Sequence, residues 1–417
     1  MSDLAWIGNV VAAARPQAMA ALLRRFRDLD AAEEAFQEAC LRALKTWPKN
    51  GPPRDAAAWL IMVARNAGID HVRRRGKLTE LPDDDVISDL SDVEADTVER
   101  LDEADYRDDI LRLLFVCCHP DLPATQQIAL ALRIVSGLTV KQIARAFLVS
   151  EAAMEQRITR AKARIGGADV PFEAPGAVER SERLAAVAAM VYLVFNEGYT
   201  VGVAEERAPA ALCEEAIRLG RLLLRLFPAE PEIMGLTALM LLQHARADAR
   251  FGPDGAVVLL EHQDRRLWDR RLVAEGLALI DKALRHGRPG AYQAQAAIAA
   301  MHARAAHYDD TDWETIAQLY GTLERMQPSP IITLNRAVAL SKAQGPEAAL
   351  ALIDPLSAKL STYFYFHGAR GAFLKQLGRH DEARVAFGHA IALANSTSEA
   401  AYIRSEIESL QGVSGHP

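Results

Sequence analysis

The sequence predicts an all-α protein of several domains. Apolar residues make up 50% of the 417 residues but aromatic residues only 6%. The apolar positions recur at steps of three and four, and few runs alternate every second residue, so helices are favoured over strands. A chain of this length is too long for one hydrophobic core, and we expect two to four domains.

The net charge of -7 hides a segregation of charge along the chain. Residues 1–76 contain 12 basic and 8 acidic side chains, residues 80–109 contain 2 and 14, and residues 110–168 contain 8 and 3. The charge of the whole chain argues against a nucleic-acid binder, but this distribution predicts two basic modules on either side of an acidic tether. Such a tether cannot bury a core, so we expect a solvated linker.

The cysteines and the apolar runs indicate the compartment. Four cysteines show no disulfide-framework spacing, and the N-terminus has no signal-peptide pattern. The most apolar run, Leu184 to Phe195, is 12 residues long, whereas a membrane span needs roughly twenty. We therefore expect a cytoplasmic protein with no membrane segment.

The first two predicted helices cover residues 4–27 and Asp30 to Trp47. The second has a regular apolar stripe, predicted to be buried, that consists of Ala35, Phe36, Ala39, Cys40, Ala43, Leu44 and Trp47. Its opposite face consists of Glu33, Glu34, Gln37, Glu38, Arg42 and Lys45. We expect Glu33 and Glu38 to face outward. The residues alone leave open whether this face is simply solvated or docks a partner helix.

A third helix is predicted from Asp55 to Arg75, after a break at Pro48, Asn50, Gly51, Pro52 and Pro53. Its predicted inner side includes Trp59, Met62, Val63, Asn66, Ala67 and Ile69. Three arginines, Arg73 to Arg75, occupy its last turn. They either complement the helix dipole or hold phosphates.

The segment Ile110 to Val135 contains Cys117, Cys118 and His119. A zinc or redox site is one interpretation, but adjacent cysteines cannot easily bind one ion and no matching second pair follows. Small buried residues before a turn at Pro120 are the other interpretation. We expect no metal site and no cofactor.

The stretch Leu138 to Ile165 has the pattern of a helix-turn-helix. Thr139 and Gln142 form a capping-box start, Ser150 is a suitable N-cap for the second helix, and Met154, Ile158, Ala161 and Ile165 are spaced to face inward. The opposite face combines residues able to contact base edges or phosphates, which are Glu155, Gln156, Arg157, Thr159, Arg160, Lys162 and Arg164. This geometry predicts a DNA-reading second helix, although two ordinary core helices with solvated charges would share the pattern.

A break at Gly166 and Gly167 separates this part from a helical tail with weak internal repetition. Tyr363 to Ala394 has the layout of a tetratricopeptide repeat, and Leu334 to Leu356 is a weaker copy. Close helix approach is expected at Ala369 and Gly371, a turn at Leu377 and Gly378, and packing at Ala383, Phe387 and Ala390. A solenoid of this kind would offer a concave surface to a protein or ligand partner; a compact bundle without a partner is the alternative.

The order DAAEEAFQEACLRAL, AAWLIMVARNAGIDHVRRR, acidic linker and GLTVKQIARAFLVSEAAMEQRITRAKARI resembles the extracytoplasmic-function group of sigma-70 family factors. VYLVFNEGYT, at Val191 to Thr200, resembles the subgroup with a C-terminal tetratricopeptide-like extension. The resemblance implies region 2 at residues 1–78, a linker at 79–109, region 4 at 110–168 and a regulatory helical domain at 169–417. It also implies core RNA polymerase and promoter DNA as partners.

The same resemblance assigns roles to single residues. It implies that Glu33, Glu34, Gln37, Glu38 and Arg42 bind polymerase, and that the seven outward residues of the second helix of the helix-turn-helix contact the -35 element. For the -10 element it implies Lys49, Asn50, Trp59, Arg65, Asn66, Asp70, Arg73, Arg74 and Arg75, with Lys49 and Asn50 in a loop, Trp47 to Arg54, that captures a flipped base.

We found no phosphate-binding glycine loop, nucleophile elbow or His-Glu-x-x-His motif, so no catalytic residue is predicted. The sequence thus predicts a sigma factor that acts by binding and strand capture rather than as an enzyme. The alternative is a one-component regulator, in which the tail senses a ligand or protein and the helix-turn-helix binds an operator.

Overall fold

The computed structural model describes residues 5–76, 103–119, 121–147, 149–167, 177–200, 208–252, 258–394 and 397–411. Every secondary-structure element of more than one residue within these ranges is a helix, which confirms the predicted all-α class. The chain divides into two compact units: unit 1 is Met1–Thr200 with Ala208–Ala216, and unit 2 is Val201–Arg207 with Ile217–Pro417. Residues 79–102 of the predicted linker lie outside the described residues, but residues 103–109 are helical and Asp109 is buried, so the prediction of a solvated linker is wrong for its last seven residues.

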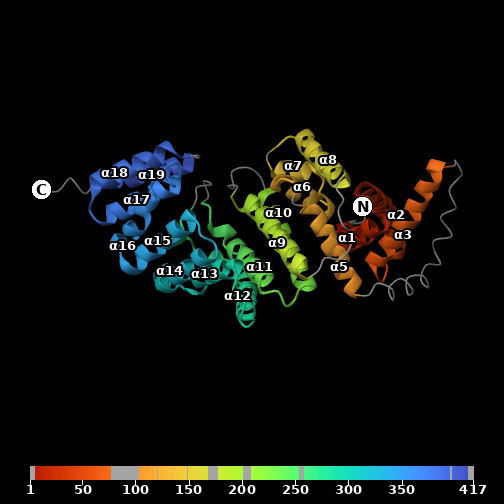
Figure 1. Cartoon of the computed structure of the whole chain (residues 1–417), viewed down its shortest axis with the longest axis horizontal. Helices are drawn as coiled ribbons and strands as arrows, with labels where there is room; N and C mark the ends of the chain where they lie inside the picture. Colours follow the sequence, from red (N-terminus) through yellow and green to blue (C-terminus); the bar gives the residue numbers. More distant parts are fainter. Residues whose placement is uncertain are drawn as a thin grey trace. The chain divides into compact units, whose positions relative to one another are not determined.

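Three helices open unit 1 and pack against one another: α1 (Ala5–Phe26), α2 (Leu29–Asn50) and α3 (Ala56–Gly76) (Figure 1). Their core includes Phe36, which is fully buried, and the buried Trp47 and Trp59, and the half-buried Trp6 lies beside them. The ring of Trp47 stacks on Trp6 at a centroid distance of 6.4 Å and meets Trp59 edge-on at 5.3 Å. Such aromatic pairs contribute beyond the area that they bury, so they fix how α2 and α3 meet.

The helix α2 is longer than predicted. Asp28 caps its start, with its carboxylate accepting a hydrogen bond from the amide of Ala31, and the helix continues through Pro48 to Asn50. Pro48 is exposed and lies in the last turn, and the amide of Gly51, at φ 79°, closes that turn on the carbonyl of Trp47. Lys49 and Asn50 therefore belong to a helix end and not to a loop, which corrects the predicted position.

Among the described residues, the further helices of unit 1 are α5 (Glu103–Cys117), α6 (Ala124–Ile134), α7 (Val140–Ala146), α8 (Glu151–Gly167) and α9 (Ala177–Thr200). The helix α5 packs on α1, α6 packs on α8, and α9 packs on both α5 and α6. The α9 contact includes the guanidinium of Arg183 above the ring of Phe115. Thus α9, which the sequence groups with the tail, packs on the helix-turn-helix region.

The Cys117–Cys118 pair lies at the buried end of α5. Burial raises the pKa of the Cys118 thiol to about 12 and that of Cys117 well above its usual range. Both thiols are buried and uncharged, so they pack as small apolar residues of the core.

The helix α10 (Ala208–Leu226) runs from unit 1 into unit 2, whose other helices are α11 (Pro231–His244), α12 (Arg270–Leu284), α13 (Ala291–Arg304), α14 (Trp313–Met326), α15 (Pro330–Gln344), α16 (Pro346–Ile353), α17 (Phe364–Gln376), α18 (His380–Ala392) and α19 (Thr397–Gln411). From α11 to α19, successive helices pack against one another, most extensively α11 with α12 and α17 with α18. Among the described helices, none combines the length and apolar character that a membrane span requires.

The predicted close approach at Gly371 is present in the pair α17 and α18. A Cβ at Gly371 would lie 2.6 Å from the ring of Phe387, so only glycine permits this helix spacing. Gly378, at φ 71°, makes the turn between the two helices, and Ala383, Phe387 and Ala390 are buried as predicted.

Candidate nucleic-acid and polymerase interface

The helices α7 and α8 form the predicted helix-turn-helix. The capping box is present: the hydroxyl of Thr139 accepts from the amide of Gln142, and the side chain of Gln142 accepts from the amide of Thr139. The hydroxyl of Ser150 accepts from the amide of Ala153 at the start of α8. Each cap satisfies backbone donors that a helix start leaves free, so both helices begin where the sequence predicts.

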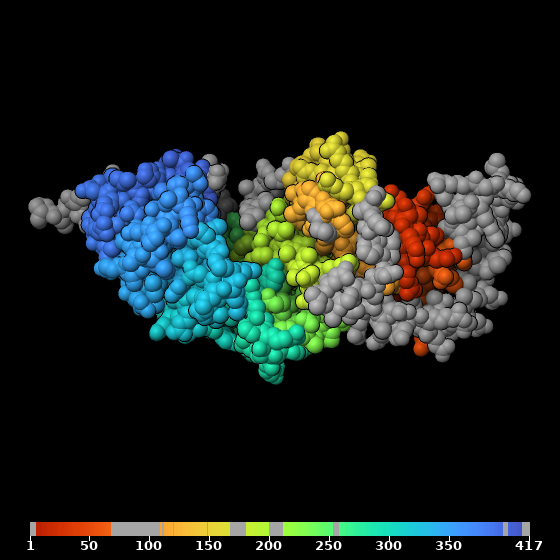
Figure 2. Space-filling view, viewed as in Figure 1, coloured from red at the N-terminus to blue at the C-terminus, as the bar shows by residue number. Residues whose placement is uncertain are grey.

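The helix α8 has one buried face and one exposed face. Met154, Ile158, Ala161 and Ile165 are buried, as predicted. Glu155, Gln156, Thr159, Arg160 and Arg164 are exposed, and Arg157 is partly exposed. The residues of α7 and α8, in yellow, lie at the surface of unit 1 (Figure 2). A row of amide, hydroxyl and guanidinium groups is thereby available to one groove of a duplex.

The outer face of α2 differs from the prediction at Glu33. Glu34, Gln37 and Glu38 are exposed, and Arg42 is partly exposed and pairs with Glu38 at 3.5 Å. Glu33, however, is only 4% exposed. The expectation that Glu33 faces outward is wrong, because basic side chains from three other helices cover its carboxylate.

These basic partners come from distant parts of the chain. The Oε1 of Glu33 lies 2.6 Å from a guanidinium nitrogen of Arg133 and 3.8 Å from one of Arg15, while its Oε2 accepts from the Nζ of Lys162 at 2.8 Å. Burial lowers the pKa of Arg15 despite the nearby carboxylate of Glu33. Buried charges persist only when they are paired, so Glu33 is the centre of an ion cluster that joins α1, α2, α6 and α8.

Lys162 is consequently not a freely exposed phosphate contact. It is partly buried, and its Nζ also donates to Asp30 at 2.6 Å. Burial works against its charged form, but the hydrogen bonds that Lys162 donates to Asp30 and Glu33 outweigh that effect and raise the pKa of Lys162. In this arrangement Lys162 binds α2 rather than nucleic acid.

The side chain of Arg15 completes the cluster by contacting backbone carbonyls of α6. Its Nε donates to the carbonyl of Ile134 at 2.9 Å and one Nη donates to that of Arg133 at 3.2 Å. These carbonyls belong to the last turn of α6, where cations are favoured by the helix dipole. Its guanidinium also lies 4.8 Å from the ring centroid of Phe36. No local pattern predicts this role, because the partners of Arg15 lie on other helices that are distant along the chain.

The residues predicted to contact the -10 element fall into three groups. Lys49, Asn50, Arg65 and Asn66 are exposed, so the predicted inner position of Asn66 is wrong. Trp59 is buried and contacts Trp47, which makes it a core residue. Asp70, Arg73, Arg74 and Arg75 belong to α3, but their side chains lie outside the described residues.

Two leucines on α2 are exposed, which the sequence analysis did not predict. Leu44 is 47% exposed instead of buried, and Leu41 is 55% exposed. Leu41 lies three and four residues after Glu38 and Gln37, so the three side chains share one face. Leu44 follows Leu41 by three positions, so the two leucines form one exposed apolar patch, and contiguous apolar patches rimmed by polar residues mark protein interaction surfaces.

Comparison with known families gives three matches along the chain. Residues 10–78 match sigma-70 region 2, residues 112–165 match sigma-70 region 4, and residues 183–284 match a family of unknown function, DUF6596. The chain is 68% identical over 410 residues to the uncharacterized protein R00370 of Rhizobium meliloti (strain 1021), covering 98% of this chain and 97% of that protein. No solved structure matches the chain.

Proposed function

The chain belongs to the sigma-70 family of RNA polymerase sigma factors, and we propose that it is an extracytoplasmic-function sigma factor with a C-terminal regulatory domain. Sigma factors bind core RNA polymerase and promoter DNA and catalyse no bond chemistry. We assign region 2 to residues 1–78, the linker to 79–102, region 4 with its leading helix α5 to 103–168 and a tetratricopeptide-like domain to 169–417. We place the protein in the cytoplasm, where its polymerase partner acts.

The outer face of α2 is our proposed polymerase-docking surface. It combines the exposed acidic and amide groups of Glu34, Gln37 and Glu38 with the exposed side chains of Leu41 and Leu44. A purely solvated helix face gains nothing from two exposed leucines, whereas a docked helix buries them against its partner. This observation carries the proposal. Glu33 supports the same helix from its buried side and makes no contact with polymerase.

The exposed face of α8 is our proposed -35 reader. We assign base contacts to Glu155, Gln156, Thr159 and Arg160 and phosphate contacts to Arg157 and Arg164. Lys162 becomes available to a phosphate only when it separates from Asp30 and Glu33. This proposal is supported by the position of these six residues, other than Lys162, on the exposed or partly exposed side of α8, whose start is capped.

For the -10 element, we propose direct contacts by Lys49, Asn50, Arg65 and Asn66, which are exposed at the end of α2 and along α3. Trp59 acts through packing, because it holds α3 against Trp47. We also assign Asp70 and Arg73 to Arg75 to strand opening, as basic side chains at a helix end suit a phosphate backbone.

The C-terminal domain is proposed to modulate activity through a protein or ligand partner. The assignment is supported by the packing of α15 on α16 and of α17 on α18, and by the close approach of Gly371 on α17 to Phe387 on α18. A one-component operator-binding regulator would also need a sensing domain, so the presence of the C-terminal domain does not distinguish the two functions. The docking surface on α2 distinguishes the two functions, because only a sigma factor needs it.

The docking proposal is tested with purified core RNA polymerase and the full-length protein. The double variant Glu38→Lys, Leu41→Ser should weaken core binding at least about tenfold, with an unchanged helical circular dichroism spectrum. Arg160→Ala is the matched control, since it lies on α8 and should leave core affinity unchanged. Wild-type affinity of the double variant would refute the docking surface. A wild-type protein that ignores core polymerase but binds one duplex specifically would instead establish the operator-binding regulator.

The role of the tail is tested with a shortened chain that keeps unit 1 intact. Ending the chain near Gly167 would remove α9, which packs on α5 and α6, and would expose their core. A chain that ends at Leu226 retains α9 and all of α10. More promoter-specific transcription from this chain than from the full protein would identify an inhibitory tail, less would identify a required one, and equal transcription would refute modulation.

A further inference from the structure

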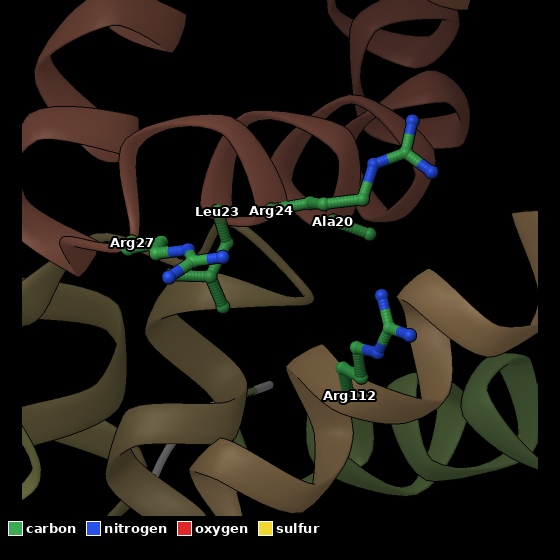
Figure 3. Close-up of a pocket in the computed structure, with 5 residues that line it drawn as sticks. All are labelled: Ala20, Leu23, Arg24, Arg27 and Arg112. Carbon is green, nitrogen blue, oxygen red and sulfur yellow. The ribbon is translucent and has the colours of Figure 1, made fainter. Parts of the chain in front are cut away.

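Two cavities among the described residues differ in size. The cavity between α1 and α5 (Figure 3) is lined by Ala20, Leu23, Arg24, Arg27 and Arg112 and has a volume of about 130 Å³. The second cavity lies in unit 2 and has a volume of about 630 Å³. Small-molecule sites measure about 300–1,000 Å³, so the second of these two has the size to hold an organic ligand.

Three segments of unit 2 line this larger cavity. They are residues 261–266 of the connection between α11 and α12, residues 306–309 between α13 and α14, and Lys342 on α15. The connection, residues 245–269, is longer than the ~12–15 residues beyond which loops are uncommon in compact domains. Its described residues contain 3₁₀ turns and no α-helix. A long connection of this kind usually serves a function when its contacts hold it in place.

Arg265 holds the connection in place. Its Nη1 donates to the carbonyls of His302 and Ala305 at the end of α13, to the second at 2.6 Å. Cations are favoured at this end of a helix. The guanidinium also lies 4.7 Å from the ring centroid of Trp268. These contacts attach the connection to α13 and give the cavity a fixed wall.

Some of the charged side chains that line the cavity are already compensated. The guanidinium of Arg266 donates to the carboxylate of Asp264 at distances of 2.7 to 3.1 Å, and Arg265 is engaged with α13. These side chains therefore have little hydrogen-bonding capacity left for a ligand.

The other charged side chains of the lining, Lys342, Glu261 and Asp309, keep such capacity. The Nζ of Lys342 lies 3.8 Å from Oε2 of Glu261, which is too far for a hydrogen bond, and each of these two side chains is 38% exposed. Asp309 is exposed. Neither carboxylate accepts a hydrogen bond from another described residue. One ammonium and two carboxylates can thus bind groups of a ligand.

These three charges lie around the hydroxyl of Tyr308. Burial raises the pKa of Tyr308, and the charges of Glu261 and Asp309 add to this rise. Lys342 opposes it, with its Nζ 5.3 Å from the ring centroid of Tyr308. Charges of both signs therefore occupy one part of the cavity.

This combination of charges selects the class of ligand. An anion would face the two carboxylates, a cation would face the ammonium, and an uncharged apolar molecule would take all three charges out of water without a partner. A zwitterion instead compensates charges of both signs. The exposed side chains of His262 and His307 can donate or accept hydrogen bonds, so they suit either end of such a ligand.

We propose that this cavity binds a zwitterion, either a free α-amino acid or a short peptide, with its carboxylate at Lys342 and its ammonium at Glu261 and Asp309. Both sources carry the same two charged groups. The inference deepens the modulatory role proposed for the C-terminal domain, and it rests on that role only for the consequence that occupancy of the cavity changes transcription. Binding itself needs neither polymerase nor DNA.

The test begins with thermal unfolding of the full-length protein in the presence of each standard amino acid and of trialanine. A ligand that binds the folded chain raises the Tm, and isothermal titration calorimetry then gives its affinity and stoichiometry. We expect one ligand per chain. Lys342→Met and Glu261→Gln should each reduce the affinity at least about tenfold. Because both side chains are partly exposed, the Tm without ligand should change little.

The matched control is Lys282→Met, which removes an exposed lysine of the same unit that does not line the cavity. Its affinity should stay within about twofold of wild type. Two derivatives of the bound ligand test the recognition of each charge, since the N-acetyl form lacks the ammonium and the carboxamide lacks the carboxylate. Both should bind more weakly than the free ligand. Glu261→Gln should cause no further loss with the N-acetyl form, and Lys342→Met none with the carboxamide, because the same contact is already absent.

Three results would overturn the proposal: no binding of any amino acid or of trialanine by the wild-type protein, no greater loss of affinity in Lys342→Met than in Lys282→Met, or a derivative that binds as tightly as the free ligand. Tighter binding of trialanine than of any free amino acid assigns the cavity to peptides, and the reverse order assigns it to amino acids. These measurements contain no polymerase. Their failure therefore leaves the proposed sigma-factor function intact, and a failure of core binding leaves the cavity proposal intact.

Discussion

The Nζ of Lys162 lies 2.8 Å from Oε2 of Glu33, although 129 positions separate the two residues in the sequence. This hydrogen-bonded ion pair links α8, the helix proposed to read DNA, to the buried side of α2, the helix proposed to dock polymerase. Arg133 of α6 and Arg15 of α1 share the same carboxylate. One acidic side chain thereby connects the region 2 helices with the helix-turn-helix.

Replacement of Glu33 by glutamine should destabilise unit 1. The change keeps the shape of the side chain but leaves Arg15, Arg133 and Lys162 without the charge that compensates them. Removing one partner of a buried ion pair costs about 3–5 kcal/mol. We expect the free energy of unfolding to fall by an amount near the lower end of this range, because Lys162 still pairs with Asp30. Urea unfolding followed by tryptophan fluorescence measures it.

The matched control is Glu38→Gln on the exposed face of the same helix. Its ion pair with Arg42 is solvent-exposed on the glutamate side, and such pairs contribute about 0–1 kcal/mol. Equal effects of Glu33→Gln and Glu38→Gln would show that the buried cluster contributes no special stability.

The contact between α2 and α8 should be absent in a promoter complex. The -10 and -35 elements are about 25 base pairs apart, which is about 85 Å at 3.4 Å per base pair, whereas Lys162 and Asp30 are in direct contact. A protein with Asp30→Cys and Lys162→Cys joined by a short bismaleimide should still bind core polymerase but should fail to initiate at a promoter with both elements. Each single-cysteine variant, treated with the same reagent, is the control. Normal initiation by the cross-linked protein would mean that the contact persists on DNA.

Arg160→Ala and Arg164→Gln should affect DNA binding in different ways. Both residues are exposed on α8, but we assign Arg160 to a base and Arg164 to a phosphate. Loss of a base contact should cost roughly 1–3 kcal/mol and relax the preference at one position of the -35 element, while loss of a phosphate contact should weaken all sequences alike and reduce the salt slope by about one. Binding of the full protein with core polymerase to single-substituted promoters, at two salt concentrations, distinguishes the outcomes. An unchanged preference at every -35 position in Arg160→Ala would remove that residue from the reading face.

The sequence predicted those features that depend on neighbouring residues. The capping box at Thr139, the cap at Ser150 and the buried face of α8 follow from spacings of three and four residues, and all three are present. The same reasoning failed at Leu44, because Ala43 and Trp47 define the centre of the buried face of α2 and Leu44 follows Ala43 by about 100° around the helix.

The environment of Glu33 could not be predicted in this way. An acidic residue between Ala32 and Glu34 fits an outer helix face equally well, and only the tertiary arrangement brings Arg15, Arg133 and Lys162 to it.

The stability of unit 2 should fall as the pH decreases below about 6.5, because of His302. Burial first, and then the nearby charges of Arg246 and Arg265, lower the pKa of His302 from 6.5 to about 4. The unfolded chain therefore binds a proton at this histidine before the folded chain does, so stability is full above pH 6.5 and is lost progressively toward pH 4. Each pKa unit corresponds to about 1.4 kcal/mol, which gives a loss of about 2 kcal/mol by pH 5.

Amide hydrogen exchange in α13 and α14 at pH 7 and pH 5, corrected for the intrinsic rates, measures this change within unit 2. The variant His302→Gln should flatten the pH dependence, because the glutamine side chain binds no proton in this range. His286 is exposed on the same unit, so His286→Gln is the matched control and should retain the wild-type dependence. If His302→Gln still showed the full loss of stability between pH 7 and pH 5, another group would have to account for that loss and the assignment to His302 would be wrong.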